Sequence, residues 1–464
     1  MKLVKLRVIT TTILLSTMFA LPSTFDGYAG AASLHDPFII TAFDDHKDTD
    51  KPVDFRDDKE AAKKWGEEKA KEWKLTFTEK DKINGFLDDK NKIMTKYKEI
   101  SFTADGKTQA GDPFAEEIKI LKDIDKALSK ANLSASIHTY KNVAPAEIGF
   151  HKTLTNGNQL DPEGKKKFIE QFQGKELKFD GYLTTHLTAQ DVTAAERIIL
   201  KVTVPSGKGS TPTKAGLILN KNEYQMFIDN GYMLHVDKIT QITQKGKECI
   251  QVEGTLKKNL DFKNDINNEA DKWGKDHYKT WANATAKGEP DAPNRLNPDQ
   301  LRDILGYMER DYQAINTYLR DNGKGDAALD EKIKNISEGL RKTSIPENMT
   351  VYRLCSNLEF GYEIGQTPTL EDFEGKFLNQ IHEEKGFYST SIASAGLDFG
   401  NRPLILRLHV PKGSIAAYVT ALGGKTGEKE ILFDKGSKYT IDKITKVTVK
   451  GKPKLVIDGT LLTK

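Results

Sequence analysis

The stretch Ile198–Pro205, IILKVTVP, occurs again as LILRLHVP at Leu404–Pro411. Short runs of aliphatic and β-branched residues bounded by proline or glycine are typical of strands. A repeat period of roughly 200 residues is much longer than that of a solenoid, and it indicates two related domains. Further matches at this spacing would extend the duplication to the whole chain.

Three more segments repeat in the same order around this stretch. VDF at 53–55 matches LDF at 260–262, VDKIT at 236–240 matches IDKIT at 441–445, and EGTL at 253–256 matches DGTL at 458–461. The four tryptophans fall in one repeated segment, as Trp65 and Trp73 in the first copy and Trp273 and Trp281 in the second. The matches cover most of the chain and predict a duplicated module.

Each copy begins with charged segments of helical spacing, such as Lys59–Trp73 and Pro298–Arg320. Short strand-like runs broken by Gly, Pro and Asn follow. Helices before strands within each copy predict the α+β class. We expect the boundary near Lys258–Asp261, which gives an N-terminal domain at 32–258 and a C-terminal domain at 259–464.

Composition narrows the choice of partner and compartment. The 464 residues include 70 Lys and Arg against 67 Asp and Glu, a net charge of +3 that is too small for a nucleic-acid-binding surface. Residues 1–31 have a basic start, an apolar run over 8–21 and an Ala-x-Ala site at 29–31, which predict a secretory signal peptide. Only Cys249 and Cys355 are present, too few for a disulfide scaffold.

Polar residues that differ between the copies indicate where their chemistry differs. The second copy has an arginine for a lysine, a hydroxyl-rich run of different composition, and a carboxylate for an amide. These differences are Arg353 against Lys141, Ser389-Thr390-Ser391 against Thr184-Thr185, and Glu428-Lys429-Glu430 against Glu223-Tyr224-Gln225.

The residues found in the second copy suit one kind of reaction. Arg353 can donate two hydrogen bonds to a phosphate. Glu428 and Glu430, two apart on a strand, would share one face at about 7 Å. Two such carboxylates can stabilise a developing sugar cation and deprotonate a nucleophile. We therefore expect one catalytic copy and one degenerate copy that is kept for binding.

The ordered set Tyr352-Arg353, Ser389-Thr390-Ser391 and Glu428-Lys429-Glu430 resembles the enzymatic components of binary actin-ADP-ribosylating toxins, of the vegetative insecticidal and iota-toxin types. The resemblance covers essentially the whole chain after the signal segment. It implies two tandem ADP-ribosyltransferase-like domains, each a perpendicular two-sheet β core with flanking helices. It also implies that only the C-terminal domain binds NAD.

The resemblance assigns roles to individual residues. It implies that Glu430 bonds the ribose 2′-hydroxyl and favours the oxocarbenium ion, that Glu428 orients or deprotonates a target arginine, and that Ser389 begins a strand that shapes the nicotinamide pocket. The implied NAD-binding set is Arg353, Tyr307, Tyr312, Asn316, Glu359, Phe399, Arg402, Ser389 and Glu430. Two positions depart from the family pattern, Leu354 in place of a second arginine and Lys425 in place of a target-docking aromatic.

These implications together predict a secreted mono-ADP-ribosyltransferase that transfers ADP-ribose from NAD to an arginine of host actin and blocks polymerisation. The first domain would dock on a separate pore-forming component that carries the enzyme into the host cytosol. We expect a monomer that uses NAD as substrate, needs no metal, binds no nucleic acid and does not insert stably into membranes.

Two other functions stay open on the residues alone. A secreted glycoside hydrolase would use the same carboxylate pair, because both reactions pass through an oxocarbenium-like state. A non-enzymatic protein would use both domains to bind surfaces. Equal NAD binding by the two separated domains, or by neither, would favour the non-enzymatic function.

Overall fold

The computed structural model describes most of the chain from Lys51 onward, in residues 51–88, 114–179, 181–206, 213–220, 222–265, 268–323, 325–363, 366, 368–394, 402–423, 428–449 and 452–463. They belong to one compact unit, Asp48–Lys464. The expected signal peptide at 1–31 lies outside the described residues, as do Phe399 and Lys425. We call residues 51–258 the first module and residues 259–464 the second module.

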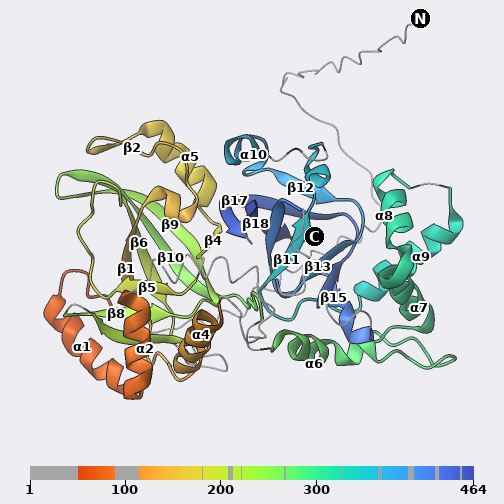
Figure 1. The fold of residues 1–464 in the computed structure, drawn as a ribbon, viewed down its shortest axis with the longest axis horizontal. Coiled ribbons are helices and arrows are strands. Elements are labelled where there is room, and N and C mark those ends of the chain that lie inside the picture. The colour runs from red at the N-terminus through yellow and green to blue at the C-terminus, as the bar shows by residue number, and fades with distance from the viewer. Residues whose placement is uncertain are drawn as a thin grey trace, which may run out of the picture. The chain divides into compact units, whose positions relative to one another are not determined.

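The first module begins with helices and continues mainly with strands (Figure 1). Its elements are α1 (Lys59–Glu72), α2 (Phe77–Asp88), α4 (Ala115–Leu128), β1 (Ile137–Val143), η1 (Pro145–Ile148), β2 (Thr155–Asn156), β3 (Gln159–Leu160), α5 (Pro162–Phe172), β4 (Glu176–Lys178), β5 (Leu183–His186), β6 (Ile198–Val204), β7 (Ala215–Asn220), β8 (Glu223–Ile228), β9 (Tyr232–Gln244) and β10 (Lys247–Lys258).

The second module repeats this plan. Its elements are α6 (Ala270–Ala282), α7 (Pro298–Gly306), the π-helical turn η2 (Tyr307–Asp311), α8 (Tyr312–Arg320), α9 (Ala327–Leu340), β11 (Met349–Cys355), η3 (Asn357–Phe360), α10 (Leu370–Phe377), β12 (Ile381–Glu384), β13 (Tyr388–Ser391), β14 (Leu404–Val410), β15 (Ala416–Tyr418), η4 (Val419–Leu422), β16 (Glu430–Phe433), β17 (Ser437–Val449) and β18 (Lys452–Leu462).

Each module contains a mixed eight-stranded sheet, and the two sheets share one topology. The strand orders are β4-β9-β10-β6-β1-β5-β8-β7 and β12-β17-β18-β14-β11-β13-β16-β15. In each sheet one pair, β10 with β6 and β14 with β18, is parallel, while the other ladders are antiparallel. The predicted duplication and the α+β class are confirmed.

Two groups of strands within each sheet meet at a single ladder pair. This pair is Tyr140 with His186 between β1 and β5, and Tyr352 with Ser391 between β11 and β13. By contrast, β11 and β14 pair along the whole of β11, from Met349 to Cys355. The two groups in each module correspond to the two-sheet core that was expected.

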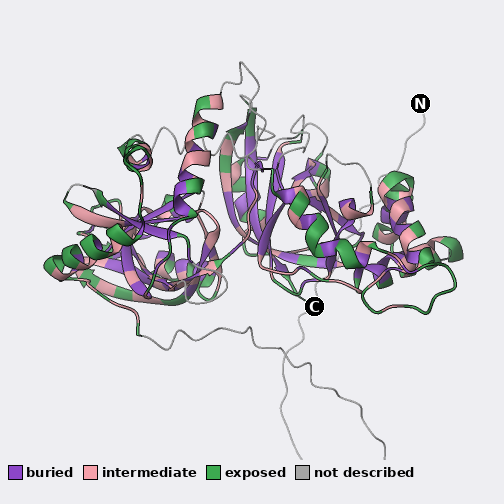
Figure 2. Cartoon of the chain, turned by 90° about the horizontal axis from the view of Figure 1, so that it is seen from below, coloured by how far each residue is buried: buried purple, intermediate pink, exposed green. Residues whose placement is uncertain are grey.

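The strands are largely buried, whereas the helices also present exposed residues (Figure 2). Helix α1 approaches its sheet closely because Gly66 lies against the ring of Tyr224, and α6 does so through Gly274 against Tyr418. A Cβ atom at either glycine would come within 2.4 Å of the ring. This close approach places the first helix of each module directly against its sheet.

The segment Pro298–Arg320, expected as one helix, contains a π-helical turn. Asn297 and Gln300 form a capping box and Pro298 occupies the first turn, so the helix starts as its sequence predicts. The turn Tyr307–Asp311 then separates α7 from α8. Such a turn changes the angular register of the residues that follow, and it is frequent at functional sites.

Among the described residues, no helix has the length and apolar character needed to cross a membrane. Both cysteines are buried and carry free thiols. Within the same residues, no group of three or more His, Cys, Asp or Glu side chains could hold a metal ion.

Candidate active site

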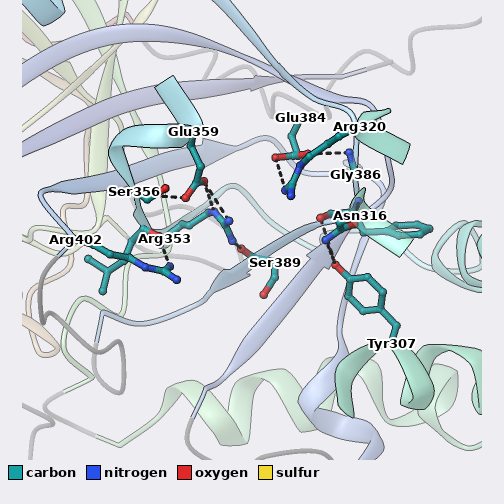
Figure 3. A network of polar contacts seen from close by, with 12 residues as sticks. Tyr307, Asn316, Arg320, Arg353, Ser356, Glu359, Glu384, Gly386, Ser389 and Arg402 are labelled. Carbon is teal, nitrogen blue, oxygen red and sulfur yellow. Dashed lines mark hydrogen bonds and ion pairs between the residues drawn. The ribbon is translucent and has the colours of Figure 1, made fainter. Parts of the chain in front are cut away.

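Three neighbouring strands bring together the three motifs that distinguish the second module. Arg353 lies on β11, Ser389 on β13 and Glu430 at the start of β16, and β13 is hydrogen-bonded to both of the others. Ser391 pairs with Glu430 across the β13–β16 ladder. Motifs that are about 40 residues apart along the chain therefore form one site. Figure 3 shows two of its residues, Arg353 and Ser389.

Arg353 is held by a carboxylate and a backbone carbonyl. Its Nε and Nη2 donate to Glu359 Oε2 at 3.2 and 3.1 Å, and its Nη1 donates to the carbonyl of Ser389 at 2.8 Å. The guanidinium also lies over the ring of Tyr388, 4.8 Å from the ring centroid. Burial alone would lower the pKa of Arg353, but Glu359 and neighbouring groups together more than offset it, so the pKa is raised and the side chain stays charged.

Glu359 is itself fixed by the short helix η3. Its Oε1 accepts a hydrogen bond from the backbone N–H of Ser356 at 2.8 Å, which completes a capping box. The first module keeps this cap, because Glu147 accepts in the same way from Ala144. The capping glutamate is thus common to both modules, whereas the pairing of this glutamate with an arginine is found in the second module.

Glu430 is the buried carboxylate of the site. Only 7% of its surface is exposed, its backbone N–H donates to Thr420 Oγ1 at 2.8 Å, and its side chain is hydrogen-bonded to Ser389. Burial raises its pKa to about 7, and the charge of Glu428 adds to this rise, while Ser389 and Arg353 oppose it. This carboxyl group therefore titrates near neutrality.

The expectation that Glu428 and Glu430 lie two apart on one strand is wrong. Strand β16 begins only at Glu430, and Lys429 has a positive φ of 49°. Glu428 therefore lies in a bend before the strand and is exposed. The left-handed backbone at Lys429 gives the two carboxylates different environments, which strict alternation on a strand would not do.

Tyr307 and Asn316 meet across the π-helical turn and are buried. Asn316 Nδ2 donates to the Tyr307 hydroxyl at 2.9 Å, and Asn316 Oδ1 accepts from the backbone N–H of Phe387 at 3.0 Å. The Tyr307 hydroxyl also donates to the carbonyl of Phe387 at 3.4 Å. Their polar atoms hold the residue that precedes β13, and hence the strand that carries Ser389.

The other expected NAD-side residues lie in different surroundings. Tyr312 is 45% exposed on α8, although it lies one turn from the buried Asn316. Arg402 donates from Nη1 to the carbonyl of Leu354 at 2.9 Å, which places it beside the strand of Arg353. Phe399 is not among the described residues, so its expected place at the site stays a prediction.

An arginine and a glutamate that the sequence reasoning missed extend this network. Arg320 forms two hydrogen bonds with Glu384, at 3.0 and 3.1 Å, and Glu384 also accepts from the N–H of Gly386 at 2.8 Å. Arg320 follows Asn316 by four residues and so continues its face of α8 (Figure 3). The four-residue spacing of Asn316 and Arg320 could have indicated that Arg320 lies near the site. It could not have indicated that Glu384 on β12 is the partner of Arg320.

The first module has the same framework without the same chemistry. Lys141 faces Leu200 on β6 as Arg353 faces Leu406 on β14, and Gln225 faces His186 as Glu430 faces Ser391. The predicted alignment of the copies at these positions is confirmed. Lys141, Thr184, His186 and Gln225 help to line an open cleft of about 380 Å³. The buried carboxylate and the arginine fork are both replaced there.

A comparison with protein families finds the same match in both modules. The ADP-ribosyltransferase exoenzyme family matches residues 62–259 and again residues 270–464. The two matched ranges correspond closely to the two modules and together span most of the chain.

Solved structures resemble the whole arrangement. One is BECa, an ADP-ribosylating toxin of a binary enterotoxin of C. perfringens, with NADH. It is 31% identical, covers 89% of this chain and 100% of its own length, and has a TM-score of 0.74. The enzymatic component C2-I of the C2 toxin from Clostridium botulinum is 26% identical with the same coverage and a TM-score of 0.70.

A relative that matches only part of this chain is also found. The mono-ADP-ribosyltransferase C3 of a Clostridium botulinum C phage is 28% identical over 188 residues, which cover 37% of this chain and 70% of the relative. The similarity thus extends from a two-module arrangement to proteins that match about one module.

Proposed function

Because this chain belongs to the ADP-ribosyltransferase exoenzyme family, we propose that its second module transfers ADP-ribose from NAD to an arginine side chain of a host protein. The observation that carries the proposal is the buried Glu430, hydrogen-bonded to Ser389 and near Arg353, with the exposed Glu428 two residues before it. The glycoside hydrolase alternative finds no support, since both modules match a transferase family.

The residues of the site offer cations for the diphosphate of NAD and an aromatic ring for one of its bases. Arg353 uses three of its five N–H donors on Glu359 and Ser389, which leaves donors for a diphosphate oxygen. Arg402 adds a second cation, and Tyr312 adds an exposed ring. The solved relative BECa, described with NADH, supports a dinucleotide as substrate.

Glu430 is suited to the step that breaks the bond to nicotinamide. In its ionised form it would accept a hydrogen bond from the ribose 2′-hydroxyl and stabilise the positive charge that develops on the sugar. Negative charge in a site sheltered from water stabilises that state more strongly than negative charge at the surface. Ser389 would keep the carboxylate oriented through its hydrogen bond.

Glu428 is suited to bind and deprotonate the arginine that accepts ADP-ribose. Its exposed carboxylate can pair with the planar guanidinium of an arginine and take up its proton as the new bond forms. In the first module Glu223 occupies this position, but Gln225 stands where a carboxylate is needed for cleavage. We therefore assign NAD cleavage to the second module alone.

The proposed biological setting follows the same relatives. BECa and C2-I are described as parts of a binary enterotoxin and of the C2 toxin, which supports a separate component that delivers the enzyme into the host cell. We propose that the first module docks on that component, that the protein is secreted as a monomer, and that the acceptor is an arginine of host actin. The actin assignment rests on the resemblance of the three ordered motifs to those of binary actin-ADP-ribosylating toxins.

The test uses labelled NAD with monomeric actin. We expect Glu430→Gln to abolish nicotinamide release, and Glu428→Gln to abolish transfer while slow hydrolysis of NAD continues. Glu223→Gln, at the matching position of the first module, is the control and should leave both reactions unchanged. Label on cysteine or asparagine would contradict the arginine assignment, and full activity of Glu430→Gln would contradict the assigned site.

A further inference from the structure

Lys429, the residue between the two glutamates, is held away from both of them. Its Nζ lies 2.5 Å from Asp265 Oδ2, and the two side chains are only 15% and 2% exposed. A lysine beside two carboxylates would ordinarily be free to pair with either one. Here the ammonium is bound instead to an acid from the first residues of the second module.

Asp265 is fixed on its other side. Its Oδ1 accepts hydrogen bonds from the backbone N–H groups of Glu269 at 2.7 Å and Ala270 at 3.1 Å, where α6 begins. The carboxylate thus caps a helix through one oxygen and holds Lys429 through the other. Any movement of Lys429 would have to break this pairing.

The backbone around Lys429 is equally constrained. A left-handed φ of 49° is unfavourable for a residue with a side chain and persists only where the surroundings impose it. The carbonyl of Lys429 accepts from the N–H of Ile392 at 3.0 Å, and the next N–H, of Glu430, donates to Thr420. These bonds and the ion pair together hold the turn that exposes Glu428 and buries Glu430.

The first module provides an internal comparison. Asp58 matches Asp265, since each donates its N–H to the carbonyl of the phenylalanine three residues earlier at 2.7 Å and each caps the first helix of its module. The counterpart of Lys429, however, is Tyr224, which lies within strand β8 and packs on Gly66. The capping aspartate is common to both modules, whereas the lysine pair accompanies the two glutamates.

We propose that Lys429 is a positioning residue for transfer to protein, acting through its ion pair with Asp265. The pair keeps the ammonium off Glu428, so that this carboxylate stays available for the guanidinium of an acceptor, and it holds the left-handed turn that presents Glu428. This inference rests on the proposed function. It concerns the transfer step, because Glu430 keeps its own contacts with Ser389 and Thr420.

The test compares two reactions of the full chain. Nicotinamide release without acceptor reports cleavage, and label transfer to monomeric actin and to agmatine reports the acceptor step. We expect Lys429→Met and Asp265→Asn each to lower transfer about tenfold while release changes by less than about twofold. The amide oxygen introduced by Asp265→Asn can still cap α6, so a loss of transfer in this variant would report the ion pair rather than the helix.

Two further variants make the test specific. Lys429→Arg should restore most of the transfer, and the double variant should be no worse than either single one, because both remove the same interaction. The matched control is Lys342→Met, which removes a similarly buried lysine, 2.5 Å from Asp291, outside the site. It should leave the ratio of transfer to release unchanged.

Three results would overturn the inference. They are wild-type rates of both transfer and release in Lys429→Met, an equal loss of both reactions in that variant, and a failure of Lys429→Arg to exceed it in transfer. A wild-type protein that releases no nicotinamide would instead contradict the proposed function, and that result is distinct from all three.

Discussion

At the scale of single residues, the environment of Glu430 links activity to pH. Burial and the charge of Glu428 raise its pKa to about 7, from an ordinary value of 4.5. If the carboxylate form breaks the bond to nicotinamide, cleavage should rise with pH and level off above about 7. Glu428→Gln removes the neighbouring negative charge, so the midpoint of the release profile should move to lower pH. A profile that is flat between pH 5 and 8 would contradict this role of Glu430.

The same group makes a prediction for stability. Between pH 4.5 and about 7 the folded protein retains a proton that the unfolded chain has released, so this carboxyl destabilises the fold increasingly as pH rises. The full difference corresponds to about 3 kcal/mol above pH 7. Glu430→Gln should therefore gain unfolding free energy relative to wild type at pH 8 and gain little at pH 4. Denaturant titrations at pH 4 and pH 8 measure the gain in unfolding free energy. Equal gains at the two pH values would contradict a raised pKa of Glu430.

At the scale of elements, the π-helical turn and α8 act on strand β13. Asn316 bonds both Tyr307 and the backbone of Phe387, so Asn316→Ala leaves two buried polar groups without this partner. We expect a loss of about 1–3 kcal/mol in unfolding free energy and a raised KM for NAD, because the strand of Ser389 loses its support. The control is Thr317→Ala, at an exposed position of the same helix. An unchanged KM for NAD in Asn316→Ala would show that α8 does not support the NAD-binding site.

The sequence predicted the elements better than their junctions. The duplication, the order of helices before strands and the match of Lys141 with Arg353 depend on patterns that recur along the chain, so they could be inferred before the structure. The π-helical turn at Tyr307 and the left-handed Lys429 could not, because the surrounding fold imposes both against local preference. The partners of Arg320 and Lys429 were missed for a related reason, since each lies far away in sequence.

At the scale of the whole molecule, a buried ion pair joins the two modules. In the first module Asp54 accepts from Tyr140 and pairs with Lys201 of the same module at 3.1 Å. In the second, Asp261 accepts from Tyr352 in the same way, but Arg407, the counterpart of Lys201, is bonded to Asp458. The cation that pairs with Asp261 is Lys178 of the first module, at 3.0 Å.

This exchange of partners predicts that the second module depends on the first. Burial alone would raise the pKa of Asp261, but Lys178, Lys263 and the Tyr352 hydroxyl together more than offset it, so the pKa is lowered. Lys178→Met would remove the ion pair from this buried carboxylate. We expect a loss of about 3–5 kcal/mol in unfolding free energy, and Lys178→Met with Asp261→Asn should recover much of it. Lys201→Met, at the more exposed pair of the first module, should cost about 1 kcal/mol or less. Equal losses in Lys178→Met and Lys201→Met would show that the ion pair between the modules stabilises the fold no more than the more exposed ion pair of the first module.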